Sequence, residues 1–524
     1  MRIAALDLGS NSFHLAVAQV HPDGTFESLV REKEMLRLGD VVSREGLVTP
    51  EAADAAVRTV RRFRLLAEAA GAGEILARAT SALRTATNGD EVVARIEQEA
   101  GVVVDVISGL EEARLIFSAV RAAVLIDPGP AVCFDLGGGS VEIMVGDAGG
   151  LVWSTSERLG VARLAAEFVT TDPISKAERR RLRRHLVDAL GPLALTVGRF
   201  EPKMAIGSSG TLEDLAEMAA VRRPQALPRS LNQLSVTRDE ILSLHEDLLA
   251  STSAERRRMD GLETRRVDLI VAGSMFLATA LELFEVDELT VSEWSLREGI
   301  LLDAIHRHDP ADLSDDPRAI RRASVQSLAR RCSWPEEHSR RVAALALELF
   351  DQTRELHELG DDARELLEYA ALLHDIGEHV AHEGHDRHAA YLVQHGNLRG
   401  FDPDEIVLIT ALVRWHRRGE PKANDSLVGS LDRSTRDTVR RLAALLRIAD
   451  GLDRSRRQVV RHVQVGIGPS LVLVGLHADG DPELELWGAR RKRELFERVF
   501  DREVEITAHS AVISLSERAT DAVD

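Results

Sequence analysis

The chain has 524 residues, 44% of them hydrophobic, and a formal net charge of −19 at pH 7. This acidic balance argues against a general nucleic-acid binder, although local basic patches would still accept an anionic substrate. The two cysteines show no disulfide or CxxC pattern, and the opening strand leaves no room for a signal peptide. The chain also lacks a long uncharged apolar run. These features favour a cytoplasmic protein without a membrane partner.

The first predicted element is a β-hairpin whose tight turn recurs later in the chain. RIAALDLGSNSFHLAVAQV and AVCFDLGGGSVEIMVG each read as a strand, an Asp/Gly/Ser turn and a returning strand, with the turns at Asp7–Ser12 and Asp135–Ser140. The offset, 135 − 7 = 128 residues, is the size of a domain and predicts a duplicated domain rather than a solenoid. Two such turns facing each other would bind a phosphate chain from both sides through backbone N–H groups and hydroxyls.

Residues 1–125 continue as alternating helices and strands. The pattern predicts a helix over Glu51–Ala70, strands in GEILARATSALR and VVVDVIS, and a helix in EEARLIFSAVRAAV. Residues 126–305 repeat this plan, with a strand, a turn and a helix predicted in DLIVAGSMFLATALELF and a strand and a helix in DELTVSEWSLREGILLDAI. This alternation predicts an α/β fold built from two similar subdomains.

Three further features of these subdomains suit a phosphate group. Gly207–Thr211 is a small-residue turn that opens a helix, where free N–H groups and the helix dipole favour an anion. Ser108–Arg114 places two carboxylates at the start of a helix, and Arg84 follows a strand. Each feature alone is weak, because Gly/Ser turns are usually only turns and acidic residues at helix starts usually serve the helix dipole. Together with the two hairpin turns, they predict one phosphate-binding cleft.

The C-terminal part has a different character. His306–Pro317 is rich in Asp and Pro and is predicted to be a linker. Residues 318–455 show helical periods without strands, apart from a polar loop predicted at 420–436, and form a helical domain. Residues 456–524 return to strand patterns in VQVGIG and LVLVGL, followed by a helix around Arg490–Phe500, and form a small α+β domain.

The motifs also resemble a known family. DLGSNSFHL, ATSALR, ISGLEEARLIF, DLGGGSVEI, GSSGT and VSEWSLREGIL occur in this order over residues 1–304 and are similar to the exopolyphosphatase / guanosine pentaphosphate phosphohydrolase family, part of the acetate kinase–sugar kinase–Hsp70–actin superfamily. The resemblance implies duplicated actin-like (ribonuclease H-like) domains at 1–125 and 126–305. It also implies a Mg²⁺-assisted hydrolase that releases terminal orthophosphate from inorganic polyphosphate or guanosine pentaphosphate, and a homodimer.

The resemblance further implies roles for individual residues. Glu112 matches the base that orients or deprotonates the attacking water, and Arg84 would stabilise charge on the terminal phosphate. Asp7, Asp135 and Glu142 match acidic positions that hold Mg²⁺ or water. The residues expected to contact phosphate, besides Asp7, are Ser10, Asn11, Ser12, Gly137, Gly138, Gly139, Ser140, Gly207, Ser208, Ser209, Gly210 and Thr211.

The helical segment carries a second possible site. His338, the pair His374-Asp375 and Asp450 follow an order that resembles the metal-dependent HD phosphohydrolase superfamily, which implies a divalent metal such as Mn, Fe, Zn or Ni and a second hydrolytic centre. More histidines nearby could complete a second metal position: His379, His382, His385, His388 and His416. The alternative, implied by the long members of the family, is a helical domain that lacks activity, supports dimerisation and lines a basic channel for the polyphosphate chain.

Two other functions stay open at this point. One is an ATP-dependent kinase of the same superfamily, against which the SGLEEARL motif argues. The other is a non-catalytic sensor that binds polyphosphate or the alarmone. Aromatic residues make up only 4% of the chain, so nothing in it resembles a nucleic-acid stacking surface.

Overall fold

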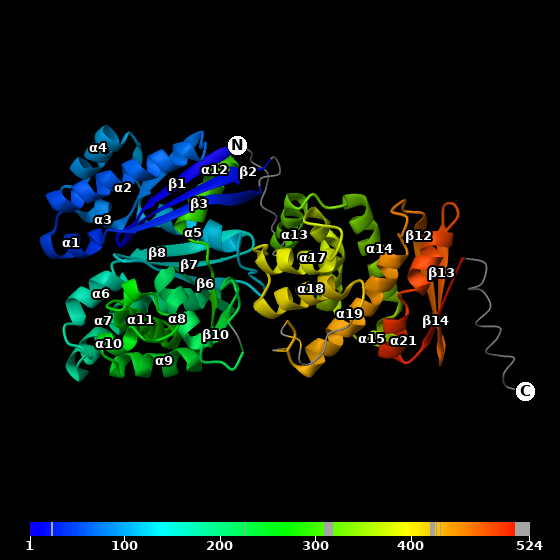
Figure 1. The fold of residues 1–524 in the computed structure, drawn as a ribbon. Helices are drawn as coiled ribbons and strands as arrows, with labels where there is room; N and C mark the ends of the chain where they lie inside the picture. The colour runs from blue at the N-terminus through cyan, green and yellow to red at the C-terminus, as the bar shows by residue number, and fades with distance from the viewer. Residues whose placement is uncertain are drawn as a thin grey trace, which may run out of the picture. The chain divides into compact units, whose positions relative to one another are not determined.

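The computed structural model describes residues 1–21, 25–225, 227–308, 318–419, 425, 427–429 and 431–508 (Figure 1). Contacts within the chain divide it into two compact parts: unit 1, Met1–Ile320, and unit 2, Arg321–Asp524. No helix in the described ranges combines the length and apolarity that a membrane span requires.

Unit 1 is built on two sheets. The first has the order β3-β2-β1-β4-β5 and the second the order β10-β11-β9-β6-β7-β8. The strands are β1 (Arg2–Leu8), β2 (Ser12–Val20), β3 (Phe26–Met35), β4 (Glu74–Ala79), β5 (Val104–Val106), β6 (Ala131–Leu136), β7 (Val141–Asp147), β8 (Gly150–Glu157), β9 (Met204–Ser208), β10 (Ser235–Thr237) and β11 (Glu288–Val291).

The two sheets share one topology. In each, three antiparallel strands (β1–β3, β6–β8) are followed by parallel neighbours, β4 and β5 in the first sheet and β9 and β11 in the second. Asp7 pairs with His14 and Asp135 with Glu142, at the same register position of the two hairpins. The predicted duplicated α/β fold is therefore confirmed, with β10 added at one edge of the second copy.

Helices pack on both sheets. They are α1 (Leu38–Glu45), α2 (Pro50–Ala69), α3 (Ser81–Thr85), α4 (Gly89–Ala100), α5 (Gly109–Arg121), α6 (Val161–Phe168), α7 (Lys176–Val197), α8 (Gly210–Ala220), α9 (Arg238–Ala250), α10 (Ser253–Arg256), α11 (Ile270–Leu283) and α12 (Leu296–His308), with single 3-10 turns η1 (Gly198–Phe200) and η2 (Thr264–Arg266). Apolar residues of α5 and α12 share one core with residues of both sheets, so these two helices join the subdomains. The end of α12 extends into the predicted linker, and residues 309–317 lie outside the described residues.

One predicted element of unit 1 is wrong. The segment DLIVAGSMFLATALELF contains the single helix α11 instead of a strand, a turn and a helix. Every residue of Ile270–Leu281 is buried, and an apolar run buried on all sides has no helical period to detect. Gly273 does not form a turn. It lets α11 approach Thr211, since an added Cβ would lie 2.5 Å from Thr211 Cγ2.

Unit 2 contains helices and a small sheet. The helices are α13 (Ala319–Arg331), which begins two residues before the unit boundary, α14 (Glu336–Gln352), α15 (Arg354–His357), α16 (Asp361–Leu373), the 3-10 turn η3 (Ile376–His379), α17 (His385–His395), α18 (Pro403–Trp415), α19 (Arg433–Gly451), α20 (Glu483–Arg490) and α21 (Glu494–Phe500). The sheet has the order β12-β13-β14, with β12 (Val460–Ile467), β13 (Leu471–Ala478) and β14 (Glu503–Ala508). The helices and the sheet share one hydrophobic core. Residues 420–424, 426 and 430 of the polar loop predicted at 420–436 lie outside the described residues. The last four residues of that predicted loop, 433–436, belong to α19.

Candidate functional site

The two Asp/Gly/Ser turns of unit 1 contact each other. A Cβ added to Gly138 would lie 3.0 Å from Asn11 Cβ, and one added to Gly139 would lie 2.8 Å from Ser10 Oγ. Ser81, at the start of α3, approaches the same glycine, with its Oγ 2.7 Å from the added Cβ. A side chain at either position would force its neighbours to shift, and the close approach brings the backbone of one turn against the hydroxyls of the other.

Two polar atoms of these turns are buried. Ser10 Oγ and Asn11 Oδ1 are buried without a hydrogen bond to any of the described residues. Backbone N–H groups at the start of α6 donate to the carbonyls of Gly137 and Gly138, which fixes the second turn. Buried hydroxyls without a partner are rare in folded proteins and are expected where a ligand binds.

Glu112 lies in the first turn of α5. Ser108 caps this helix by accepting a hydrogen bond from the Glu111 N–H at 3.1 Å, and Glu112 is 7% exposed. Arg84 Nη1 contacts Glu112 Oε2 at 3.0 Å and donates to the Ile107 carbonyl at 2.7 Å. Burial, together with the smaller influence of nearby Asp135, raises the pKa of Glu112 to about 7 against the lowering influence of Arg84. A carboxylate with such a pKa can exchange a proton near neutral pH.

Three other carboxylates surround Glu112. Burial, with Glu112 and Asp135 as neighbours, raises the pKa of Asp7 to about 8, although Arg297 opposes this. Burial also raises the pKa of Asp135, which accepts hydrogen bonds from Ser208 Oγ at 2.5 Å and Ser295 Oγ at 2.6 Å. The pKa of Glu142 rises well above its usual value because of burial and the charges of Glu112 and Asp135.

This arrangement fits a cation. Buried carboxylates that repel one another gain stability from a positive charge between them. Among the described residues, however, every group of three ligating side chains with donor atoms within 4.8 Å lies in unit 2. A Mg²⁺ ion beside these carboxylates would thus be held by one or two of them together with water and substrate oxygens, as is usual for Mg²⁺ at phosphate sites.

The third predicted turn is shorter than the motif suggests. Gly207 and Ser208 belong to β9, where Ser208 holds Asp135, and Ser209 makes the turn with φ of 84°. Ser209 Oγ donates to the Leu136 carbonyl at 2.9 Å, which ties this turn to the second hairpin. Gly210 and the buried Thr211 begin α8.

Basic residues that the sequence did not assign to the site lie beside these turns. The Arg266 guanidinium lies directly over Gly210, since an added Cβ would be 1.8 Å from Arg266 Nη2. Arg297 Nη1 lies 3.2 Å from His14 Nδ1, and His14 Nε2 lies 2.7 Å from Ser12 Oγ. Burial and then Arg297 lower the pKa of His14, so its ring is neutral. The VSEWSLREGIL motif contains Arg297 and Ser295, so a signal for both was present in the sequence.

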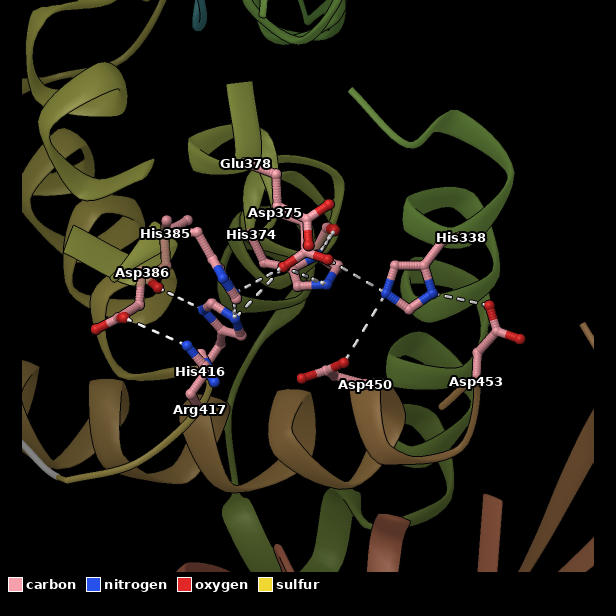
Figure 2. A network of polar contacts seen from close by, with 12 residues as sticks. His338, His374, Asp375, Glu378, His385, Asp386, His416, Arg417, Asp450 and Asp453 are labelled. Carbon is pink, nitrogen blue, oxygen red and sulfur yellow. Dashed lines mark hydrogen bonds and ion pairs between the residues drawn. The ribbon is translucent and has the colours of Figure 1, made fainter. Parts of the chain in front are cut away.

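Unit 2 brings together the four residues of the predicted HD-like site (Figure 2). His338 comes from α14, the pair His374-Asp375 follows α16, and Asp450 lies near the end of α19. His338 Nε2 lies 3.6 Å from Asp375 Oδ2 and 3.9 Å from Asp450 Oδ1, and His374 Nε2 lies 3.6 Å from Asp375 Oδ1. His338, His374 and Asp375 are buried, and Asp450 is partly buried.

Burial and neighbouring charges shift the pKa values of the residues in this cluster. Burial would raise the pKa of Asp375, but His374, His385 and His416 together hold it well below the usual range. Burial lowers the pKa of His374, and burial together with His374 lowers the pKa of His416 to about 3. The carboxylate is therefore ionised at pH 7, and these two imidazoles are neutral, which are the forms that bind metal ions.

The additional histidines separate into two groups. His385 and His416 join the cluster, and both are buried. His379 and His382 are exposed, and His388 is only partly buried. Gly384, with φ of 72°, is the N-cap immediately before α17, so His379, His382 and His385 do not share one helix face, as the glycine suggested.

Comparison with known proteins agrees with this geometry. The sequence profile of the Ppx/GppA phosphatase family matches residues 16–308, and the profile of Ppx/GppA phosphatase domain III matches residues 320–467. Exopolyphosphatase 1 of Mycobacterium leprae is 32% identical over 303 residues, which cover 58% of this chain and 89% of that protein.

Solved structures give the same result. An exopolyphosphatase from Cytophaga hutchinsonii is 32% identical with a TM-score of 0.55, covering 60% of this chain and 100% of that one. A Ppx/GppA family member from Aquifex aeolicus is 28% identical with a TM-score of 0.51, covering 59% of this chain and 99% of that one. From its paired turns, its six ordered motifs and these matches, the chain belongs to the Ppx/GppA phosphatase family.

Proposed function

We propose that unit 1 is an exopolyphosphatase that hydrolyses the terminal phosphoanhydride bond of inorganic polyphosphate. The observation that carries this proposal is the position of Glu112, a buried carboxylate paired with Arg84 beside two glycine turns that contact each other. Membership in the Ppx/GppA phosphatase family supports it, as do the exopolyphosphatases among the similar proteins.

The residues of the cleft have complementary roles in this reaction. The N–H groups of Gly137–Ser140 and the hydroxyls of Ser10 and Ser12 bind oxygens of the terminal phosphoryl group. Glu112 accepts a proton from the attacking water, whose oxygen forms a bond to the terminal phosphorus. The bond from that phosphorus to the bridging oxygen breaks, and the shortened chain leaves as an anion. Arg84 stabilises the negative charge that spreads over the terminal oxygens in the transition state.

Mg²⁺ is the cofactor that we propose for this cleft. Asp7, Asp135 and Glu142 are the residues that would hold it, directly or through water. Their raised pKa values support this assignment, because a nearby cation favours the ionised form of each carboxyl group. When bound, the ion neutralises charge shared by the carboxylates and the polyanionic substrate.

Guanosine pentaphosphate is the second substrate that we propose for the same cleft. It presents a terminal phosphoanhydride like that of polyphosphate, and Ser10–Ser12 and Gly137–Ser140 would contact that end. We expect orthophosphate release from both compounds when they are assayed side by side at equal concentrations of terminal phosphate groups.

Reaction in ¹⁸O-labelled water tests the proposed function directly. Attack by water on the terminal phosphorus places one ¹⁸O atom in each orthophosphate released from long-chain polyphosphate, which mass spectrometry detects. An ATP-dependent kinase would instead consume ATP as the phosphoryl donor and release no labelled orthophosphate from polyphosphate. Tight binding of polyphosphate in the presence of Mg²⁺ without any release would identify a sensor, and either result would contradict the proposal.

A further inference from the structure

A second group of metal-ligating atoms lies beside the predicted HD-like set. Asp375 Oδ1 is 3.2 Å from His385 Nε2 and 3.6 Å from His416 Nε2, and the two nitrogens are 3.4 Å apart. Bonds of about 2.1 Å to a tetrahedral ion place its ligands about 3.4 Å from one another. These three atoms therefore already have the spacing of one face of a coordination sphere.

Asp375 lies between this group and the predicted one. Its Oδ2 faces His338 Nε2 at 3.6 Å, and its Oδ1 faces His385 and His416 as well as His374, whose Nε2 lies 3.6 Å away (Figure 2). The first group, His338, His374 and Asp450, has donor atoms within 4.8 Å of one another, as has the second, Asp375, His385 and His416. Because its two oxygens together reach both groups, this carboxylate is placed to bridge two metal ions.

The four imidazoles are held in the orientation that metal binding needs. Three of them direct Nδ1 at a backbone carbonyl: His374 at Ala371 (2.7 Å), His385 at His382 (2.9 Å) and His416 at Val413 (2.6 Å). His338 Nδ1 lies 2.8 Å from Oδ2 of the fully buried Asp453. Because a carbonyl only accepts, each Nδ1 facing one carries the proton, and Nε2 is left to face the centre. Such outer contacts are characteristic of metal-bound histidines.

One atom of the cluster lacks a hydrogen bond. His374 Nε2 is buried without a hydrogen-bond partner in the described part of the chain, and it points into the cluster. Arg456 pairs with Asp375 Oδ2 at 2.6 Å and Lys492 pairs with Asp450, but neither cation donates a hydrogen bond to an imidazole among the described contacts. An ion-pair network would not require four converging imidazoles, and an unsatisfied buried nitrogen is costly.

We propose that unit 2 binds two first-row divalent transition-metal ions bridged by Asp375. One ion is held by His338, His374 and Asp450, and the other by His385 and His416. Imidazole and carboxylate donors favour Mn²⁺, Fe²⁺ or Zn²⁺ over Mg²⁺ and Ca²⁺, which take oxygen ligands. Two ions with few protein ligands keep positions open for water and an anionic group, the arrangement found in two-metal phosphoesterases.

A competing position for the second ion exists at Glu378, His382 and His385. The His382 side chain is 83% exposed, and Glu378 accepts hydrogen bonds from Arg456. His385 points its Nδ1 at the His382 carbonyl and its Nε2 at Asp375, so it faces the bridged centre instead. A His382→Ala variant separates the two positions.

The proposal is tested by measuring metal binding to the 524-residue chain. The protein is first stripped of metal and then incubated with Mn²⁺. Excess Mg²⁺ in the buffer fills the oxygen-ligand sites of unit 1. Elemental analysis after gel filtration should give two Mn²⁺ per chain, and electron paramagnetic resonance should show the spectrum of an exchange-coupled pair. His385→Gln and His416→Gln should each leave one uncoupled Mn²⁺. Anomalous scattering from wild-type crystals should give two peaks flanking Asp375, which keeps the test independent of how the variants fold.

The controls assign any loss to this centre. His382→Ala should retain two coupled ions, and Asp135→Asn, which changes only the unit 1 cleft, should do the same. Fewer than two ions in the wild type, an uncoupled spectrum, or loss of the second ion in His382→Ala would overturn the proposal. None of these readouts depends on phosphate release by unit 1, so failure here leaves the proposed function untouched.

Discussion

Glu112 combines two opposing influences on its pKa. Burial raises the pKa to about 7, while the Arg84 guanidinium at 3.0 Å favours the ionised form. A general base must be ionised to accept a proton from water. The reaction rate should therefore rise with pH as Glu112 loses its proton and level off above that range.

The first prediction concerns this pH dependence. In the wild type, kcat/KM for polyphosphate should rise through an apparent pKa near 7, the value for Glu112. Arg84→Gln removes the charge that lowers this pKa. The rise of kcat/KM with pH should therefore move to higher pH, and the plateau value of kcat/KM should fall. Initial rates across a pH series measure both effects. An unchanged apparent pKa in Arg84→Gln would show that a group other than Glu112 controls the rise in kcat/KM.

The second prediction concerns a positioning residue of unit 2. Asp453 contacts His338 Nδ1 at 2.8 Å and accepts from the Gln458 N–H. Asp453→Asn preserves the size of the side chain but weakens its contact with the His338 ring. The affinity for Mn²⁺ at the proposed position of His338, His374 and Asp450 should then fall about 10–100-fold. Calorimetric titration of the metal-free protein measures this. Asp386→Asn is a matched control, since Asp386 pairs with Arg414 and contacts none of the proposed ligands in the described interactions.

The contacts that orient site residues were harder to predict than the residues themselves. Asp135 was identified from its turn, but its partner Ser295 lies 160 residues away. Local spacing carries no information on such a contact, which depends on how β6, β9 and the start of α12 meet. Ser81 and Arg266 were missed for the same reason.

At the scale of elements, the repeat made the fold predictable. The two hairpins share a register that aligns Asp7 with Asp135 and His14 with Glu142. The sequence therefore indicated both the duplication and where the copies diverge. It failed for α11, because a helix buried on every side resembles a buried strand in its sequence pattern.

The third prediction tests the packing of α11. Gly273→Ala should destabilise unit 1 by about 1–3 kcal/mol, because the new Cβ would lie 2.5 Å from Thr211 Cγ2 and neither helix can move freely. Denaturant unfolding measures this change. Gly191→Ala in α7 is the control, since nothing lies within 4 Å of its added Cβ. That substitution should be neutral or stabilising by up to about 1 kcal/mol. Equal effects at the two glycines would contradict the close packing of α11.

At the scale of the molecule, the chain carries two chemically different candidate centres. The paired turns of unit 1 and the side chains beside them offer carboxylates, backbone N–H groups and hydroxyls for a phosphate chain. The cluster of unit 2 offers imidazoles around one buried carboxylate. Each unit has its own hydrophobic core, so the stability of each should respond to its own ligand.

The fourth prediction follows from this separation. A chelator selective for transition metals, added in excess Mg²⁺, should lower the melting temperature of unit 2 and leave that of unit 1 unchanged. An ion present at 100 times its Kd stabilises the folded state by about 2.7 kcal/mol, so the shift should be several degrees. Calorimetry of the full chain measures it. The double variant His374→Ala/His416→Ala should show no chelator effect, and a chelator shift that persists in it would contradict the assignment.

Two neighbouring glutamates of α5 provide a test of the catalytic role proposed for Glu112. Glu112→Gln removes the proposed base with little change in shape, whereas Glu111→Gln alters an exposed ion pair with Arg114 on the same helix turn. Orthophosphate release from long-chain polyphosphate should fall about 10²–10⁴-fold in Glu112→Gln and remain near the wild-type rate in Glu111→Gln, with polyphosphate binding retained in both. Release by Glu112→Gln at the wild-type rate would contradict the account.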